Sequence, residues 1–312
     1  MTREADFIAA LRGIATHPAA RGLMDDAAVL PVGDMGVGGA IVLTHDMMVE
    51  GVHYLPDDTP ADVAWKLLAV NLSDLAAKGA VPLGVLLGYA MTDDGAWDAA
   101  FAAGLGTAAA ALGVPVLGGD TVRMPAGAPR ALGLTALGRA PASGAPSRSG
   151  ARPGDLVYVS GTIGDAGAGL AIRLGRARGD AALVRRYTRP EPRLALGQAI
   201  APYVTAMADV SDGLLIDASR MAKASGCAIH LDLDLVPLSD ALRAMAGDSL
   251  EARLAAASAG DDYELLFTAP PGVVSDPGVT PIGRVEAGEG LVLRHGGQVV
   301  PLPGRLGYEH DA

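Results

Sequence analysis

The sequence predicts an α/β (α+β) protein with two domains: an N-terminal mixed sheet with helices, and a C-terminal α/β domain. Its 312 residues suffice for two domains of about 100–200 residues each. Hydrophobic residues make up 50% of the chain and charged residues 19%, which is typical of a globular protein with a large core. Residues 141–154, PASGAPSRSGARPG, are rich in Pro, Gly and Ser and indicate a boundary. We therefore expect domains over residues 1–145 and 146–312.

The N-terminal half alternates between helix-like and strand-like segments. Residues 1–13 are a candidate amphipathic helix, and residues 40–50 place β-branched residues before acids, as a strand ending at a site would. Residues 61–79 predict a helix that ends at Gly79. The residues expected near one face of this helix are Val63, Leu67, Val70 and Asp74. The remaining segments are strands over 81–91, 114–124 and 129–140 and an alanine-rich helix over 96–113.

The C-terminal half repeats this mixture. Residues 227–235, CAIHLDLDL, alternate strictly between apolar and polar side chains, which predicts one half-buried strand. The other predicted strands cover 155–161, 262–270, 279–286 and 290–300, and the predicted helices cover 165–179, 191–203 and 212–226. Because strands and helices mix in both halves, each domain is expected to contain its own sheet.

Charge and cysteine content exclude several classes of protein. The formal net charge of −11 argues against a nucleic-acid partner, although metal ions could still bring an anionic substrate to an acidic site. Cys227 is the only cysteine, so the chain has no internal disulfide or thiolate zinc site, which fits a reducing compartment. No signal peptide or unbroken 18-residue apolar run is evident. We expect a cytoplasmic protein that does not bind membranes.

Aspartates recur at the ends of the predicted elements. They are Asp25, Asp26, Asp46, Asp74, Asp120, Asp209, Asp212, Asp261 and Asp262. Each taken alone could cap a helix or face solvent, and Asp212 in SDGLLIDAS resembles a helix N-cap. Their apolar surroundings, as in LTHD, NLSD, LGGD and DVSD, favour a shared site instead. Oxygen ligands without thiolates favour Mg²⁺ or Ca²⁺, and Mg²⁺ often binds through a few carboxylates plus substrate phosphates.

The sequence lacks the common phosphate-binding motifs. There is no G-x-x-x-x-G-K-[ST], and the protein-kinase motifs H-R-D and D-F-G are also missing. The glycine-rich turn SGTIGDAGAGL, residues 160–170, could hold an anion, or it could simply turn tightly. Arg123 and Arg148 are candidate phosphate contacts. His53 and Tyr308, judged by local sequence alone, would more often be packing residues.

Nine ordered blocks resemble the thiamine-monophosphate kinase family, of the superfamily that includes aminoimidazole ribonucleotide synthetase. The blocks are DDAAVL, LTHDMMVEGVHY, WKLLAVNLSDLAAKGA, LGGDTVR, RSGARPGD, VSGTIGDAGAGL, DVSDGLLIDASRMAKASG, GDDYELLFT and GYEH. They extend from about residue 25 to residue 308, so the resemblance covers nearly the whole chain. It implies a two-domain synthetase-like fold, a homodimer paired through its N-terminal sheets, and an active site between the domains.

The resemblance also implies an activity and a set of site residues. The reaction is transfer of the γ-phosphoryl group of ATP, the co-substrate, to the phosphate of thiamine monophosphate, assisted by several Mg²⁺ ions. The implied metal ligands are Asp26, Thr44, Asp46, Asp74, Asp120, Asp209 and Asp212, with His45 contributing through its main chain. Among them Asp46, Asp120 and Asp212 are the expected catalytic residues. The implied nucleotide contacts are Gly119, Asp120, Arg148 and Ser211, and the implied acceptor contacts are His53, Asp261 and Tyr308.

Some positions depart from the family pattern, and two other functions are compatible with the acids. RGLM precedes Asp25 where the family usually has GIG, His45 replaces a usual Thr, and Asp261 stands where Glu also occurs. The alternatives are another ATP-dependent member of the superfamily, resembling aminoimidazole ribonucleotide synthetase, and a non-catalytic acidic metal-binding protein. Members that need a terminal reactive cysteine do not fit, because Cys227 lies far from both ends.

Overall fold

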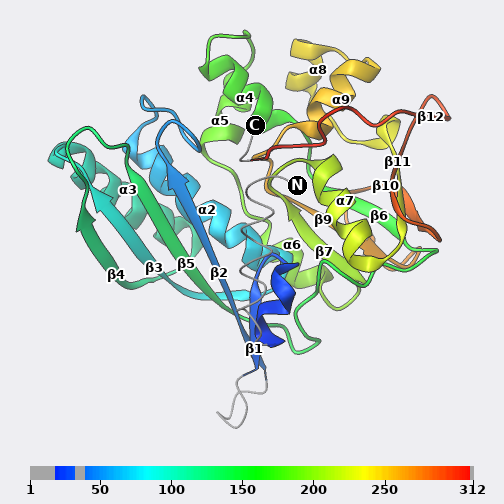
Figure 1. Cartoon of the computed structure of the whole chain (residues 1–312), viewed down its shortest axis with the longest axis horizontal. Helices are drawn as coiled ribbons and strands as arrows, with labels where there is room; N and C mark the ends of the chain where they lie inside the picture. The colour runs from blue at the N-terminus through cyan, green and yellow to red at the C-terminus, as the bar shows by residue number, and fades with distance from the viewer. Residues whose placement is uncertain (1–17, 32–38, 310–312) are drawn as a thin grey trace.

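The computed structural model describes residues 18–31 and 39–309 and contains two β-sheets with helices packed on them (Figure 1). This confirms the expected mixed α/β architecture. The first sheet lies within residues 28–139 and the second within residues 156–300. The glycine- and proline-rich segment at 141–154 connects them, and the division into domains at residue 145 stays a prediction.

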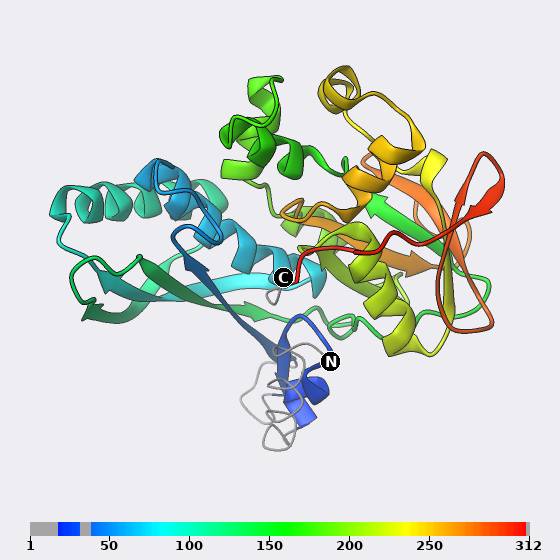
Figure 2. The same cartoon turned by 45° about the horizontal axis from the view of Figure 1, so that its top comes forward.

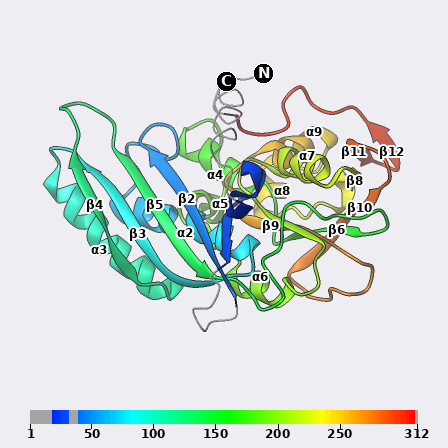
Figure 3. The ribbon, with the colours of Figure 1, turned by 60° about the horizontal axis from the view of Figure 1, so that its bottom comes forward.

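The first sheet has the strand order β1-β2-β5-β3-β4. Its strands are β1 (Ala28–Pro31), β2 (Ala40–Val49), β3 (Val81–Met91), β4 (Val116–Arg123) and β5 (Ala131–Arg139). Neighbouring strands are antiparallel except β3 and β4, which are parallel and joined through helix α3 (Gly95–Leu112). Helices α2 (Pro60–Ala77) and α3 lie along one face of this sheet, and Figure 3 shows no helix of the described residues on its other face.

The second sheet has the strand order β12-β11-β8-β10-β6-β9-β7. Its strands are β6 (Leu156–Ser160), β7 (Ala206–Val210), β8 (Ala228–Asp232), β9 (Glu264–Ala269), β10 (Val279–Glu286), β11 (Gly290–His295) and β12 (Gln298–Val300). The helices of this half are α4 (Asp165–Arg173), α5 (Ala181–Thr188), α6 (Leu194–Ile200), α7 (Leu214–Ser225), α8 (Asp240–Ala246) and α9 (Leu250–Ser258). Its core joins the inner faces of the strands to α7 and α9.

Helix α2 is buried on nearly all sides because it lies between the two sheets. It packs against β2 and β5 of the first sheet and against β7 and β9 of the second (Figure 1). Thr59 begins the helix by accepting a hydrogen bond from the backbone N–H of Asp62. The sequence predicted a single apolar face, whereas the helix also buries Lys66 and Lys78. Buried lysines need partners, and both find them among the aspartates described below.

Several local predictions differ from the structure. The strand predicted over 227–235 ends at Asp232, whose side chain accepts a hydrogen bond from the Asp234 N–H and starts a 3₁₀ turn, Leu233–Leu235. The Asp212 side chain does not cap α7, because the cap position is Gly213. The sequence patterns do not predict helices α5, α8 and α9. The candidate helix over residues 1–13 lies outside the described residues. Within the described ranges no helix is long and apolar enough to cross a membrane.

Candidate active site

A cavity of about 600 Å³ lies between the two halves of the chain. Its walls come from β2, the turn after β2, helix α2, the loop after β7, the loop before β9 and the C-terminal segment. After β12 this segment runs back to the start of α7 (Figure 2), where the Tyr308 N–H donates to the Asp212 carbonyl at 2.8 Å. The expected site residues that line the cavity are Asp46, His53, Asp74, Asp209, Ser211, Asp212, Asp261 and Tyr308.

Strand β2 and helix α2 supply one side of the acidic end. Thr44 and Asp46 alternate with His45 along β2, so their side chains share the face that meets α2. The Thr44 hydroxyl bonds to the Asp74 carboxylate. The Asp46 N–H donates to the Asn71 amide oxygen at 2.9 Å, one turn before Asp74. These contacts bring the carboxylates of Asp46 and Asp74 together where β2 crosses α2.

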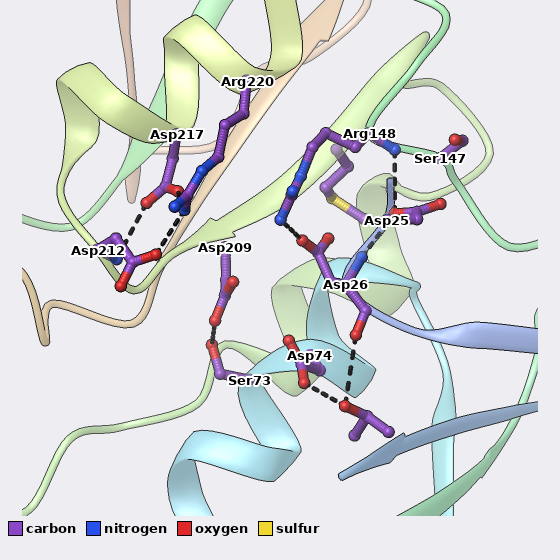
Figure 4. Close-up of polar contacts among 12 residues, drawn as sticks. Asp25, Asp26, Ser73, Asp74, Ser147, Arg148, Asp209, Asp212, Asp217 and Arg220 are labelled. Atoms are coloured by element: carbon purple, nitrogen blue, oxygen red, sulfur yellow. Dashed lines mark hydrogen bonds and ion pairs between the residues drawn. The ribbon is translucent and has the colours of Figure 1, made fainter. Parts of the chain in front are cut away.

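The end of β7 and the loop after it supply the opposite side (Figure 4). The Ser73 hydroxyl of α2 donates to Asp209 at 2.6 Å. Asp217, which sequence reasoning missed, accepts a hydrogen bond from the Asp212 N–H at 3.2 Å. Arg220 then bonds both carboxylates, at 2.5 Å to Asp212 and 3.0 Å to Asp217. Asp212 lies just before α7 and is therefore held by two side chains of that helix, Asp217 and Arg220.

The acids strongly disfavour one another's charge. Burial, followed by the charge of Asp46, raises the pKa of Asp74 well above its ordinary value. Burial and then the charge of Asp26 do the same to the pKa of Asp209. Burial is also the first cause for Asp217, ahead of Asp212, and raises its pKa to about 7. A positive ion bound among these carboxylates would offset their mutual repulsion.

This donor set fits hard divalent cations, since it consists of buried carboxylates and a threonine hydroxyl without sulfur. Among the residues that the structure describes, no three acids, histidines or cysteines are already arranged as a metal-ligand group. Mg²⁺ does not require a preformed group of three protein ligands, because it commonly takes one or two carboxylates and completes its shell with water and substrate phosphates. The acids could therefore hold Mg²⁺ together with a phosphorylated ligand.

Three basic side chains balance Asp25 and Asp26 at the far edge of the cluster. Lys78 Nζ lies 2.5 Å from Asp25 Oδ1 and 2.7 Å from Asp26 Oδ2. Arg148 bonds to the Asp26 carboxylate, and Arg21 lies 2.5 Å from Asp25. Burial would raise the pKa of Asp25, but Lys78 and Arg21 outweigh it and lower the pKa to about 2. Arg148 thus lies at the acidic cluster, as a residue that meets phosphates would need to.

The other end of the cavity contains the three expected acceptor contacts. His53 Nδ1 accepts the Val49 backbone N–H at 3.0 Å, so the proton of a neutral imidazole lies on Nε2. The Asp261 carboxylate bonds to Lys66 Nζ at 2.7 Å, another contact that sequence reasoning missed. A signal existed: Lys66 precedes Asp74 by eight residues, which places both on one side of a helix. Tyr308 lies nearby on the C-terminal segment.

Two expected site residues and one candidate phosphate contact lie outside the cavity of their own chain, and the side chain of His45 points away from it. Gly119 and Asp120 are exposed on the edge strand β4 and do not line the cavity. The His45 imidazole points to the opposite face of the first sheet, where Nδ1 lies 2.9 Å from the Thr135 hydroxyl. Its side chain therefore does not join the acids. Arg123 forms an exposed ion pair with Asp93 at 2.6 Å and is not a cavity residue.

The glycine-rich turn at residues 160–170 already has an internal hydrogen-bond acceptor. The Asp262 carboxylate accepts hydrogen bonds from the Gly164 N–H at 2.8 Å and the Ala166 N–H at 3.4 Å. Asp262 thus accepts hydrogen bonds from the free N–H groups at the start of α4, where the sequence suggested that an anion could bind. Gly167 and Leu170 of this turn and helix still line the cavity, so the segment shapes the wall.

Comparison with known proteins gives one consistent answer. Residues 24–140 match AIR synthase related protein, N-terminal domain, and residues 152–296 match AIR synthase related protein, C-terminal domain. The chain is 42% identical to the thiamine-monophosphate kinase of Caulobacter vibrioides, over 98% of this chain and 90% of that protein. The Escherichia coli K12 thiamine-monophosphate kinase is 39% identical, over 93% and 92%. The solved structure of AaThiL complexed with AMPPCP and TMP is similar with a TM-score of 0.84 at 30% identity, covering 97% of this chain and 96% of that one.

Proposed function

Because this chain belongs to the thiamine-monophosphate kinase family of AIR synthase related proteins, we propose that it phosphorylates thiamine monophosphate with ATP, giving thiamine diphosphate and ADP. The observation that carries the proposal is the cavity with two unlike ends. Buried acids line one end, and His53, Asp261 and Tyr308 line the other. A phosphorylated cation such as thiamine monophosphate has matching ends: a phosphate that needs counter-cations and a positively charged ring that a carboxylate can meet.

The acidic end is proposed to receive both phosphate groups. Mg²⁺ would be held by Asp26, Thr44, Asp46, Asp74, Asp209 and Asp212. Four of these acids line the cavity, and the contacts of Thr44 with Asp74 and of Asp26 with its neighbours support including the other two. Bound Mg²⁺ would supply the positive charge that lets two anionic phosphates approach and would stabilise the charge of the transferring group. Ser211 and Arg148 would contact the nucleotide, since both lie beside these acids.

This chain needs no general base for the transfer. The acceptor is a phosphate that is already ionised near neutral pH, so no proton has to be removed before attack. The chain's own contribution is to position the two phosphates in line and to exclude water between the domains. Asp46 and Asp212 would act at this point from opposite walls, and Arg220 and Asp217 hold Asp212 in place.

We also propose that two chains pair through the face of the first sheet opposite α2 and α3. That face and the edge strand β4 expose large apolar side chains: Leu83, Leu86, Val116, Leu117 and Val122. Such a surface is typical of an interface rather than of a solvated face. Pairing would also explain Asp120, which carries a family motif but lies outside the cavity of its own chain. In a dimer, Asp120 and Gly119 would serve the cavity of the other chain. A cytoplasmic location remains part of this proposal.

The test is transfer of labelled phosphate from γ-labelled ATP in the presence of Mg²⁺. With thiamine monophosphate, labelled thiamine diphosphate should form in step with ADP. Thiamine, which has no phosphate, is the matched control and should accept no label. ADP formation with formylglycinamidine ribonucleotide instead would favour the aminoimidazole ribonucleotide synthetase-like alternative. Cation binding without turnover of any acceptor would favour the non-catalytic alternative.

A further inference from the structure

We propose that Lys66 is a positioning residue for the acceptor end of the cavity: it fixes the Asp261 carboxylate and the turn that carries His53 relative to each other. This inference rests on the proposed function, because it concerns how the same site recognises thiamine monophosphate. No motif carried over from the family assigns a role to Lys66. The role proposed for Lys66 follows from its contacts alone.

Lys66 lines the cavity, but its ammonium group is already engaged by protein groups. Its side chain is 3% exposed, and Nζ lies 2.7 Å from Asp261 Oδ2 and 3.1 Å from the His53 carbonyl oxygen. The same ammonium group lies 3.9 Å from the centroid of the Tyr187 ring. An ammonium has three N–H donors, and two oxygens and an aromatic face account for three directions. Lys66 must therefore act through the residues that it holds.

These contacts cross between the two halves of the chain. Lys66 and His53 belong to the half that contains the first sheet, whereas Asp261 and Tyr187 belong to the half that contains the second. Asp261 is 195 residues from Lys66 in sequence. One buried side chain thus fastens two walls of the acceptor end to each other. A rotation of either half would have to break a charge-assisted hydrogen bond.

Asp261 is held in a backbone conformation that needs support. Its φ is 68°, and Tyr263 has a φ of 51°; both lie in the left-handed region that non-glycine residues rarely adopt. The Asp261 N–H donates to the Ser211 carbonyl at 2.8 Å, and the Tyr263 N–H donates to the Val210 carbonyl at 2.8 Å. The Tyr263 hydroxyl bonds to Asp261 Oδ1 at 3.1 Å. Each carboxylate oxygen therefore has a protein donor, which fixes the group while its side chain stays 31% exposed to the cavity.

The Lys66–Asp261 pair also changes what the acceptor end recognises. An unpaired carboxylate would attract any cation, including the metal ions expected at the acidic end about two helical turns away. Pairing with Lys66 cancels most of this long-range attraction and leaves short-range contacts that depend on geometry. Recognition of the acceptor ring then depends on where Asp261 is held more than on its net charge.

The experiment compares steady-state kinetics of Lys66→Met with those of wild type. We expect the KM for thiamine monophosphate to rise about tenfold or more, with the KM for ATP and kcat changed by less than about threefold. Lys223→Met is the matched control, because Lys223 is an exposed lysine outside the cavity, and it should behave as wild type. Equal increases in both KM values, or an unchanged KM for thiamine monophosphate in a folded Lys66→Met protein, would overturn the inference.

Two further variants test whether Lys66 acts through Asp261. If it does, Lys66→Met should add little to the KM increase of Asp261→Asn, so the double variant should resemble Asp261→Asn alone. Fully additive effects would contradict this. Tyr263→Phe removes only one hydrogen bond to Asp261 and should raise the same KM about threefold, which keeps the test available if Lys66→Met fails to fold. Wild-type protein that transfers nothing to thiamine monophosphate would overturn the proposed function and this inference together, whereas normal wild-type transfer with unchanged variants overturns this inference alone.

Discussion

Replacing Asp46 by Asn should stabilise the cation-free protein at neutral pH and greatly reduce its activity. Burial, followed by the charges of Asp212 and Asp26, raises the pKa of Asp46 from 3.8 to about 6, although His45 lowers it. The folded protein therefore binds a proton at Asp46 more tightly than the unfolded chain does. Ionising this group in the folded state costs free energy, because burial and the neighbouring carboxylates outweigh the effect of His45.

The magnitude follows from the two pKa values. Between pH 3.8 and about 6, folded Asp46 keeps a proton that the unfolded chain has lost, so the free energy of unfolding falls as pH rises through this window. At about 1.4 kcal/mol per pH unit, the full cost above the window is on the order of 3 kcal/mol. Asparagine carries no charge and avoids this cost. Because the neighbouring acids share the effect, we expect a gain of about 1–3 kcal/mol at pH 7.5 and a much smaller one at pH 4.5.

Urea unfolding in EDTA, at pH 7.5 and at pH 4.5, measures both values. Asp93→Asn is the matched control, because Asp93 is 65% exposed and pairs only on the surface, so the free energy of unfolding should change by less than about 0.5 kcal/mol. With Mg²⁺ and ATP present, wild type should gain more stability than Asp46→Asn, whose phosphoryl transfer should fall by about a hundredfold or more. An Asn variant that is no more stable than wild type at pH 7.5, or that gains equally at both pH values, would refute the electrostatic reasoning.

Other outcomes are expected at the edges of the site. Lys78→Met should lower the free energy of unfolding by about 3–5 kcal/mol in thermal or urea melts, because it leaves the buried Asp25 and Asp26 with less compensation; a change below about 1 kcal/mol would contradict the assigned ion pairs. Asp120→Asn should cut turnover by orders of magnitude without changing the melting temperature, since Asp120 is exposed on β4. When inactive Asp120→Asn and Asp212→Asn proteins are unfolded and refolded together, about a quarter of wild-type activity should return if Asp120 serves the partner's cavity. No recovery in dimers shown to be mixed would place both residues in the same chain's site.

The architecture and the gathering of the acids could be predicted because both depend on local patterns. β-Branched runs and glycine-ended helices predicted most strands and α2, α3 and α7. Motif order then indicated that Asp46, Asp74, Asp209 and Asp212 belong to one site, and the structure places them around one cavity. Strand alternation alone shows why the His45 side chain cannot join Asp46: neighbours on a strand point to opposite faces.

The pairing of the charges could not be predicted, because it depends on contacts between distant segments. Lys66 meets Asp261 across 195 residues, and Asp262 reaches the Gly164 N–H across 98. Nothing in a linear sequence distinguishes an acid that caps a distant turn from its neighbour that faces a cavity. Asp120 could not be placed for a different reason. It lies on an edge strand, and the role of such a residue can depend on a second chain, which one sequence does not reveal.

Helix α2 sets the direction in which an acceptor can bind. At 1.5 Å per residue, Lys66 lies about 12 Å along the helix axis from Asp74, and Lys78 lies about one turn beyond Asp74. Lys66 fixes the Asp261 carboxylate at one end, Asp74 belongs to the acidic cluster in the middle, and Lys78 holds Asp25 and Asp26 at the other end. An acceptor with a cationic ring and a phosphate can satisfy this order in only one orientation, with its ring toward Asp261 and its phosphate toward Asp74. Under the proposed function, ATP would approach from the side of Asp26 and Arg148, so that the two phosphates meet among the acids.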